Sequence, residues 1–212
     1  MKRLLRAIAW LAFLFLLVVA GVMFWVRGRG VSARAQPSWI EARAAVFMRG
    51  WMTPPIYKGL KNPVSNTPEN FVAAREHFAD HCASCHANDG SGNTEMGRNL
   101  YPKAPDMRLP RTQNLSDGEL FYIIENGIML TGMPGWSTGS PEGEKSSWQL
   151  VHFIRRLPSL TREDLQEMER LNPRSRAEFE EERKIEDFLG GGAAPAQNVS
   201  PPDPHAGHRP PQ

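Results

Sequence analysis

The chain has 212 residues, which is enough for one modest domain with appendages and too few for two full hydrophobic cores. Its formal net charge is +2, but the part after residue 30 carries 20 Lys and Arg against 23 Asp and Glu. That part is mildly acidic and has no basic patch, so the composition argues against nucleic acid as a partner.

The N-terminal segment, residues 1–30, is basic at both ends and apolar between them. Its apolar run extends from Ala7 to Val26, and Arg27 and Arg29 follow it. Twenty helical residues at about 1.5 Å each span about 30 Å, the thickness of the hydrocarbon core of a bilayer. A cleaved secretory signal has a shorter apolar region with small residues soon after it, so an uncleaved membrane anchor is the favoured reading. The basic residues on the two sides nearly balance, and charge alone leaves the orientation open.

Residues 31–66 are expected to contain one helix and a linker. Ser38 and Glu41 have the S-x-x-E spacing of a capping box, which predicts a helix that begins there and ends near Gly50. The Pro-rich stretch 52–66 is predicted to be irregular and to wrap the globular part. The helix has one apolar face, which is expected to rest on the membrane surface or on the domain. Its residues follow helical spacing: Ile40, Ala44, Phe47 and Trp51.

The globular domain is expected at residues 67–158. Thr67 followed by Pro68 is typical of a helix start, and this first helix is expected to run on to residue 82. Ser116 begins a second capping box, which predicts a short helix that stops before Gly127.

The rest of the domain is expected to consist of loops and a last helix. The stretch 87–115, rich in Gly, Asn and Pro, and the polar stretch 137–145 are predicted to be loops. The last core helix is expected from about 147 to 157, with an apolar stripe on one side, and Pro158 closes it.

A charged helical extension is predicted at residues 159–189. Thr161 and Ser175 are the expected N-caps of two helices, and Pro173 separates them. From Thr161 to the end of this extension there are 6 basic and 10 acidic residues, which favours a solvated surface. Met168 is therefore expected to lie outside the core.

Cys82, Cys85 and His86 form the pattern C-x-x-C-H, by which haem is attached covalently to proteins. Two thiols at this spacing can reach the two vinyl groups of one porphyrin, and the next residue presents an imidazole to the iron. A thioredoxin-like site needs a βαβ pattern and a zinc site needs a second pair of ligands, and neither flanks the motif. These are the only cysteines, so the sequence predicts one covalent haem c with His86 as an axial ligand.

Met133 is the predicted second axial ligand of the haem iron. An electron carrier keeps two strong ligands, and a thioether is the common partner of histidine. Gly132 and Pro134 would fix an extended loop that crosses the distal face of the haem. Met129 is expected to be a packing residue instead, and Met96 lies too near the motif in sequence to reach the opposite face.

Several motifs follow one another in order along residues 68–158. They are Phe78, C-x-x-C-H, Asp89-Gly90-Ser91-Gly92, Tyr101-Pro102-Lys103-Ala104-Pro105-Asp106, Gly132-Met133-Pro134 and Leu150 with Phe153-Ile154. Together they resemble a class I monohaem cytochrome c of the membrane-anchored bacterial kind. Because several motifs must occur in this order, the resemblance is much more specific than C-x-x-C-H alone.

The resemblance implies an all-α fold, a class I cytochrome c-like domain with an N-terminal transmembrane helix and C-terminal charged helices. The first and last core helices would cross with Ala74 against Phe153. The family also has a proline backbone carbonyl that accepts the N–H of the proximal imidazole, here that of His86. Either Pro105 or Pro102 could supply this carbonyl, which would orient the ring and raise its basicity.

The remaining tryptophan and histidine residues are expected to have mainly structural roles. The resemblance places Trp136 and Trp148 beside the haem, although both could equally be core or interface residues. His77 and His81 are four residues apart on a helix, and exposed helix positions are favoured over a metal pair. His152 lies off the apolar stripe of the last helix and is expected at the surface.

Covalent haem attachment takes place outside the cytoplasm in bacteria, which orients the predicted membrane span. The leading hypothesis is a single-pass protein of the bacterial inner membrane with its C-terminal domain in the periplasm, transferring single electrons. It is expected to be an electron-transfer protein rather than an enzyme, or a subunit of a redox enzyme. Its partners would be membrane-bound or periplasmic redox proteins, with the lipid bilayer contacted through the N-terminal helix.

Two alternatives stay open. A haem sensor or peroxidase-like protein would have an open sixth coordination position on the iron. A metal-handling or docking module would use residues 161–212, in which the tail 190–212 is expected to be disordered and contains Asp203, His205 and His208.

Overall fold

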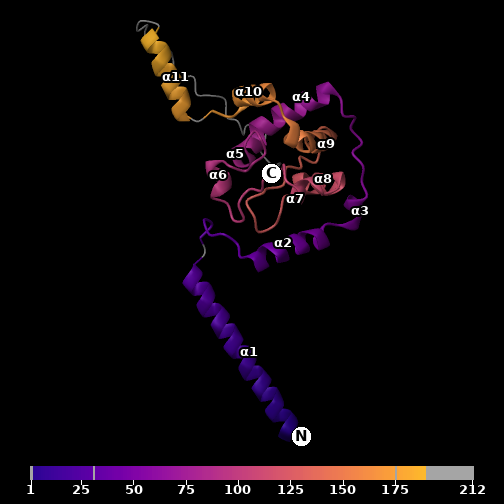
Figure 1. The fold of residues 1–212 in the computed structure, drawn as a ribbon, viewed down its shortest axis with the longest axis vertical. Coiled ribbons are helices and arrows are strands. Elements are labelled where there is room, and N and C mark those ends of the chain that lie inside the picture. Colours follow the sequence, from indigo (N-terminus) through magenta and orange to yellow (C-terminus); the bar gives the residue numbers. More distant parts are fainter. Residues whose placement is uncertain (1, 31, 175, 190–212) are drawn as a thin grey trace, which may run out of the picture. The chain divides into compact units, whose positions relative to one another are not determined.

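The computed structural model describes residues 2–30, 32–174 and 176–189, and its regular elements in these ranges are helices (Figure 1). No strand occurs in the described ranges, so the predicted all-α class is confirmed. The chain divides into two compact units, Met1–Pro173 and Arg174–Gln212.

The second unit contains the charged helix α11 (Arg176–Leu189). Its described apolar side chains include Phe179, Ile185 and Phe188, and all three are exposed. The predicted N-cap Ser175 and the tail at 190–212 lie outside the described residues.

The first helix, α1 (Lys2–Arg29), covers the whole apolar run of the N-terminus. It is the one helix of the described chain that is long and apolar enough to cross a membrane. A signal sequence near an N-terminus passes the same test of length and composition. These two features therefore fit both an uncleaved membrane anchor and a cleaved signal.

Helix α2 (Trp39–Met52) begins with the predicted capping box. The Ser38 hydroxyl accepts from the Glu41 amide, and the Glu41 carboxylate accepts from the Ser38 amide, both at 3.3 Å. The other carboxylate oxygen of Glu41 accepts a hydrogen bond from the Tyr101 hydroxyl, so this side of the helix meets the domain. The apolar side chains of α2 are exposed: Trp39, Ile40, Phe47, Met48, Trp51 and Met52.

The linker at 52–66 is not wholly irregular, because it contains the short helix α3 (Pro55–Lys58). Proline at the first helical position has the backbone angle that a helix requires, which explains why a Pro-rich stretch forms a turn of helix. Tyr57 packs on helix α8 (Asp117–Asn126), with 4.8 Å between its ring centroid and that of Tyr122. A Cβ atom at Gly118 would lie 1.8 Å from the Tyr57 carbonyl oxygen, so only glycine permits this approach.

The linker is also bonded to the last core helix, α9 (Pro141–Arg156). The Asn62 side-chain amide donates to the Trp148 carbonyl at 2.8 Å. The ring of His152 is half-buried, with its Nε2 2.7 Å from the Val64 carbonyl oxygen. The expectation of a surface position for His152 was therefore wrong, because the linker covers it.

The haem motif follows directly on the first core helix, α4 (Pro68–His77). Thr67 caps this helix as predicted, accepting from the Asn70 amide at 3.3 Å. The chain then makes a π-helical turn, η1 (Phe78–Cys82), and a last helical turn, α5 (Ala83–His86). Such π turns are frequent at functional sites, because one extra residue redirects the side chains that follow.

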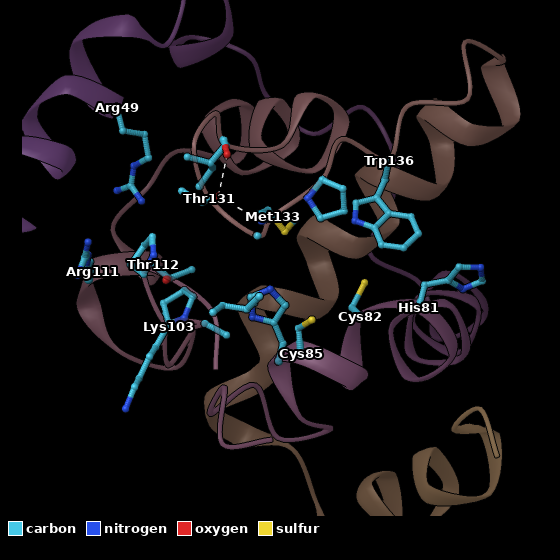
Figure 2. Close-up of a pocket in the computed structure, with 18 residues that line it drawn as sticks. Arg49, His81, Cys82, Cys85, Lys103, Arg111, Thr112, Thr131, Met133 and Trp136 are labelled. Atoms are coloured by element: carbon cyan, nitrogen blue, oxygen red, sulfur yellow. Dashed lines mark hydrogen bonds between the residues drawn. The ribbon is translucent and has the colours of Figure 1, made fainter. Parts of the chain in front are cut away.

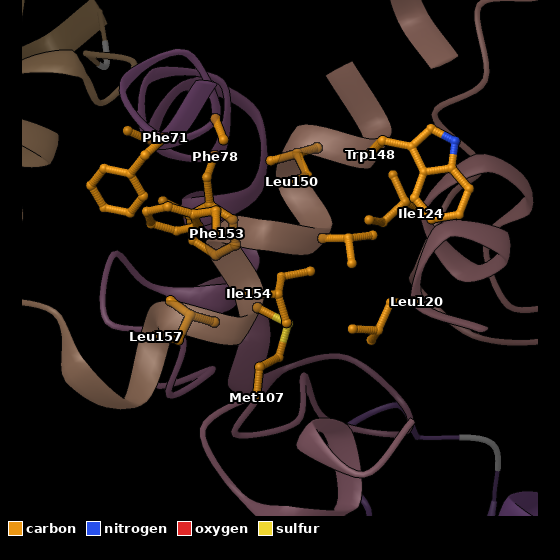
Figure 3. Close-up of a cluster of buried hydrophobic side chains, with 14 of the residues drawn as sticks. Phe71, Phe78, Met107, Leu120, Ile124, Trp148, Leu150, Phe153, Ile154 and Leu157 are labelled. Carbon is orange, nitrogen blue, oxygen red and sulfur yellow. The ribbon is translucent and has the colours of Figure 1, made fainter. Parts of the chain in front are cut away.

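The core lies where α4 packs against α9 (Figure 3). Ala74 is 1 % exposed and Phe153 is completely buried. The Phe153 ring centroid lies 5.7 Å from that of Phe71 and 4.8 Å from that of Phe78. The small side chain of Ala74 lets the helices approach while three aromatic rings fill the space around them.

Other helix boundaries differ from those predicted. Helix α9 begins at Pro141, six residues before the expected start, with Ser140 as N-cap. Pro at the first position and acidic residues in the first turn favour a helix there, although the segment is polar. The expected loop at 87–115 contains two single helical turns, α6 (Glu95–Arg98) and α7 (Pro110–Gln113).

Helix α10 (Arg162–Leu171) belongs to the same compact unit as the haem motif. Thr161 caps it as predicted. Met168 is completely buried in the core, so the expectation that it lies outside was wrong. The sequence shows many charges here, but they lie on one side of the helix and leave the other side apolar. A salt bridge of 3.1 Å between Arg75 and Asp164 joins α4 to α10.

Replacing Met168 by alanine is expected to lower the free energy of unfolding by about 2–5 kcal/mol, because it removes buried contacts and leaves a cavity. Chemical denaturation of the purified protein would measure this loss. Glu169→Ala, at the exposed neighbouring position, is the matched control and should change stability by less than about 0.5 kcal/mol. Equal stability of the two variants would show that α10 is not part of the cooperative unit.

Candidate haem site

The residues predicted to bind haem line one cavity of about 180 Å³ (Figure 2). The cavity lies between the turn that carries C-x-x-C-H and the loop that carries Met133. Six residues predicted from the sequence to bind haem are on its wall: Cys82, Cys85, His86, Pro105, Met133 and Trp136.

Residues 92–97 form hydrogen bonds and close contacts with the backbone of the C-x-x-C-H motif. The Gly92 amide donates to the His86 carbonyl at 2.7 Å, and the Thr94 hydroxyl donates to the Cys85 carbonyl at 3.1 Å. A Cβ atom at Gly97 would lie 2.2 Å from the Cys85 carbonyl oxygen. This close backbone contact leaves the side chains of the motif directed to the other side, toward the cavity.

The His86 imidazole is in the state that binds a metal. Burial lowers its pKa, so the ring is neutral at neutral pH and has a lone pair for iron. Its Nδ1 is buried, and no acceptor among the described residues bonds to it. Pro102 and Pro105 both line the cavity, but neither carbonyl makes the hydrogen bond that the resemblance implies.

The two cysteines are free thiols. Burial raises the pKa of the Cys82 thiol to about 12, with further contributions from Cys85 and Asp80. A thiol with this pKa is not a thiolate nucleophile at neutral pH. A thioether sulfur carries no charge, so bonding both sulfurs to a porphyrin suits this buried position.

A tight loop after α8 presents Met133 to the cavity. The loop starts at Gly127, whose φ of 69° is in the left-handed region that glycine tolerates. The Ile128 amide donates to the Met133 carbonyl at 3.0 Å, and the Met133 amide donates to the Thr131 hydroxyl at 3.1 Å. Met129 is 73 % exposed, so the expectation that it packs in the interior was wrong.

The two tryptophans have different positions. Trp136 lines the cavity, with its ring edge-on to His81 at 5.7 Å between centroids. Trp148 is 3 % exposed in the core and stacks on Phe121 at 4.0 Å, and it is not part of the cavity wall.

His77 and His81 lie close together before the haem motif, with 4.9 Å between ring centroids. In the part of the chain that the structure describes, no group of three or more His, Cys, Asp and Glu residues is arranged to hold a metal ion. Burial lowers the pKa of His77, and His81 lowers it further against an opposing effect of Asp80.

The lowered pKa of His77 predicts a loss of stability in acid. The unfolded chain binds the proton more readily than the folded one, so stability falls as the pH drops through the ordinary histidine value of 6.5. The denaturant midpoint should therefore fall between about pH 7.5 and pH 5.5, and it should fall less for His77→Gln. An identical fall in the variant would assign the acid sensitivity to other groups.

The sequence reasoning missed two basic residues of the cavity wall, Arg49 from α2 and Arg111 from α7. Arg49 lies near the end of a helix that the sequence shows only as amphipathic. Nothing in the neighbouring sequence indicates that its side chain lines a cavity. Arg111 lies in a stretch predicted to be a loop. Only the tertiary arrangement of α2 and α7 brings them to the cavity.

The cavity fits a covalently bound haem. It offers two free thiols, a neutral imidazole whose buried Nδ1 has no partner among the described residues, a thioether and a largely apolar wall. This donor set differs from that of a zinc or disulfide site and agrees with haem ligation.

Comparison with known proteins agrees with this chemistry. Residues 69–154 match the family described as cytochrome c oxidase, cbb3-type, subunit III. No curated protein matches the chain. The matched segment begins in α4 and ends in α9, so it contains the haem motif, the Met133 loop and both crossing helices of the core. Residues 69–154 are therefore similar to a cytochrome c domain, which points to electron transfer through haem c, and the apolar helix before them fits the membrane-anchored kind of these cytochromes.

Proposed function

We propose that the chain is a membrane-tethered periplasmic electron carrier, or the electron-transfer subunit of a redox enzyme, with one covalent haem c. The observation that carries the proposal is the meeting of Cys82, Cys85, His86 and Met133 on one cavity wall. The first three come from two successive helical turns, η1 and α5, and the fourth comes from a loop after α8.

In this proposal Cys82 and Cys85 would hold the porphyrin by thioether bonds, and His86 and Met133 would be the two protein ligands of its iron. The haem supplies a one-electron couple when bound. The protein keeps both ligands in place in the two oxidation states, which keeps the reorganisation small, and His/Met ligation raises the reduction potential. Trp136 and Pro105 contribute apolar wall that excludes water from the iron.

The membrane attachment is assigned to residues 1–52. Helix α1 would span the inner membrane with the rest of the chain in the periplasm, because haem is attached there. The exposed apolar side of α2 would lie along the membrane surface, since its outward residues include two tryptophans, Trp39 and Trp51, which prefer the membrane interface. Tethering raises the encounter rate with membrane-bound donors and acceptors through effective concentration.

We also propose how the chain is divided. Residues 1–30 are the anchor, 31–66 the helix and linker, 67–158 the haem domain, 159–189 the helical extension and 190–212 a tail. Within the extension, the buried Met168 makes α10 a structural part of the haem domain, whereas α11 belongs to the second unit.

Mass and spectral analysis of the full chain from a bacterium that matures c-type cytochromes tests the proposal. We expect one porphyrin mass that remains attached after denaturation, and low-spin spectra in both oxidation states. Carbon monoxide should bind slowly or not at all. A high-spin reduced form that binds carbon monoxide rapidly would favour the sensor or peroxidase-like alternative, and a protein without covalent porphyrin would overturn both.

Fractionation tests the tether separately. The protein should stay with the inner membrane after an alkaline carbonate wash, and protease should reach the domain only from the periplasmic side. A soluble periplasmic protein that lacks residues 1–30 would instead identify the segment as a cleaved signal.

A further inference from the structure

Two arginines stand together on one side of the cavity (Figure 2). Arg49 reaches it from α2, and Arg111 reaches it from α7. Lys103 also belongs to the wall, but Figure 2 shows its amine directed away from the centre of the cavity. The two guanidinium groups are therefore the cationic feature of this side.

The positive charges of the two guanidinium groups repel each other, and the nearby negative charge does not fully offset this repulsion. Burial lowers the pKa of Arg49, and the charge of Arg111 lowers it further, against a smaller opposing effect of Glu119. The Glu119 carboxylate already accepts a hydrogen bond from the Ser116 amide at 2.8 Å as part of a helix cap. Among the described residues, neither arginine side chain makes a hydrogen bond or ion pair. Arg49 is partly buried and Arg111 is exposed, and two like charges on one cavity wall favour an anion between them.

The cysteines lie on the other side of the cavity from Arg49 and Arg111 (Figure 2). A haem has its two vinyl groups on neighbouring pyrrole rings and its two propionates on the remaining two rings, at the opposite edge. If Cys82 and Cys85 hold the vinyl edge, the propionate carboxylates reach toward the arginines. The forked donors of arginine match a carboxylate in geometry as well as in charge.

We propose that Arg49, together with Arg111, binds a haem propionate, and that α2 is therefore a functional part of the haem pocket. This inference rests on the proposed haem. It adds to the proposed function a contribution from α2, which precedes residues 69–154, the segment that matches the family. The pocket of this chain is thus completed by an element from outside the matched domain.

Several contacts fix the position of Arg49. The Thr53 hydroxyl, which is buried, donates to the Arg49 carbonyl at 2.8 Å and closes the end of α2. The Lys58 amine donates to the Gly50 carbonyl, and the Tyr101 hydroxyl donates to Glu41 at the start of the helix. The bond from Tyr101 ties the start of the helix to the domain, and the bonds from Thr53 and Lys58 fix its last turn, which carries Arg49.

The test is the reduction potential of the full-length haem protein across pH, measured by spectroelectrochemical titration. A cation beside the haem favours the reduced form and the ionised propionate. Arg49→Gln should therefore lower the potential and move the pH inflection caused by propionate ionisation to a higher pH. Arg49→Lys, which keeps the charge but not the fork, should fall between Arg49→Gln and the wild type.

Arg43→Gln is the matched control, because it removes the same charge from an exposed position of the same helix. It should leave the potential and the pH inflection close to those of the wild type. Arg111→Gln provides a second test, with shifts in the same direction as Arg49→Gln, should the latter variant not fold. Haem-loaded Arg49→Gln and Arg111→Gln with the potential and inflection of Arg43→Gln would overturn the inference while leaving the proposed electron carrier intact. Absence of covalent haem from the wild type would instead overturn the proposed function.

Discussion

Replacing both Cys82 and Cys85 by alanine is expected to abolish covalent haem attachment completely. Each sulfur would supply one thioether bond, and the chain has no other cysteine that could replace either of them. The denatured double variant should show the polypeptide mass alone, whereas the wild type should carry one porphyrin. Haem staining after denaturing electrophoresis gives the same comparison.

Two controls show whether the loss of attachment is specific to the cysteine sulfurs. Ser84→Ala changes the exposed residue between the cysteines and should keep full attachment. A single Cys82→Ala or Cys85→Ala variant should retain one thioether, and therefore some covalent haem with an altered spectrum. Porphyrin that stays bound to the denatured double variant would rule out thioether attachment at this motif.

Met133→Leu is expected to remove the second iron ligand without unfolding the domain. Leucine is close to methionine in size and apolar character, so the packing contribution to the free energy of unfolding should change by less than about 1.5 kcal/mol. The oxidised protein should lose the weak long-wavelength absorption band of sulfur-to-iron ligation. The reduced protein should become high-spin and bind carbon monoxide rapidly, because one coordination position is open.

Met129→Leu is the matched control for the ligand experiment. Met129 stands four residues earlier in the same loop, but it is exposed and does not line the cavity. Its replacement should leave the spectrum and the reduction potential unchanged. If Met129→Leu abolished the sulfur–iron band and Met133→Leu retained it, the ligand assignment would be reversed.

The matched cytochrome domain does not stand alone in this chain. Helix α3 packs on α8 through Tyr57, α10 contributes the buried Met168, and α2 brings Arg49 to the cavity. These three helices lie outside residues 69–154. The additions therefore add buried contacts to the core and a side chain to the wall of the cavity.

Local chemistry explains which predictions succeeded. The capping boxes at Ser38 and Ser116, and the cap at Thr67 before Pro68, are short-range patterns that satisfy the free amides at a helix start. They locate the helix starts without any information on tertiary contacts. The C-x-x-C-H motif is local as well, since its residues fall within two turns of the chain.

Predictions that depended on packing fared less well. Met168 and Met129 are both methionines, and their sequence surroundings indicated the reverse of what is observed. Met168 lies among charges but faces α4 and η1 from the apolar side of its helix, while Met129 lies beside apolar residues on an exposed loop. Burial is decided by which face of an element another element covers, and neighbouring residues in sequence do not report this.

The sequence by itself determined the all-helical class, the order of the main helices and the chemistry of the candidate site, because caps, apolar periodicity and the haem motif act over a few residues. Only the tertiary structure decided that the Met133 loop and the motif share one cavity, that His152 lies under the linker and that Arg49 joins Arg111. Each of these relations joins residues far apart in the chain, and such contacts depend on how whole helices pack rather than on local preference.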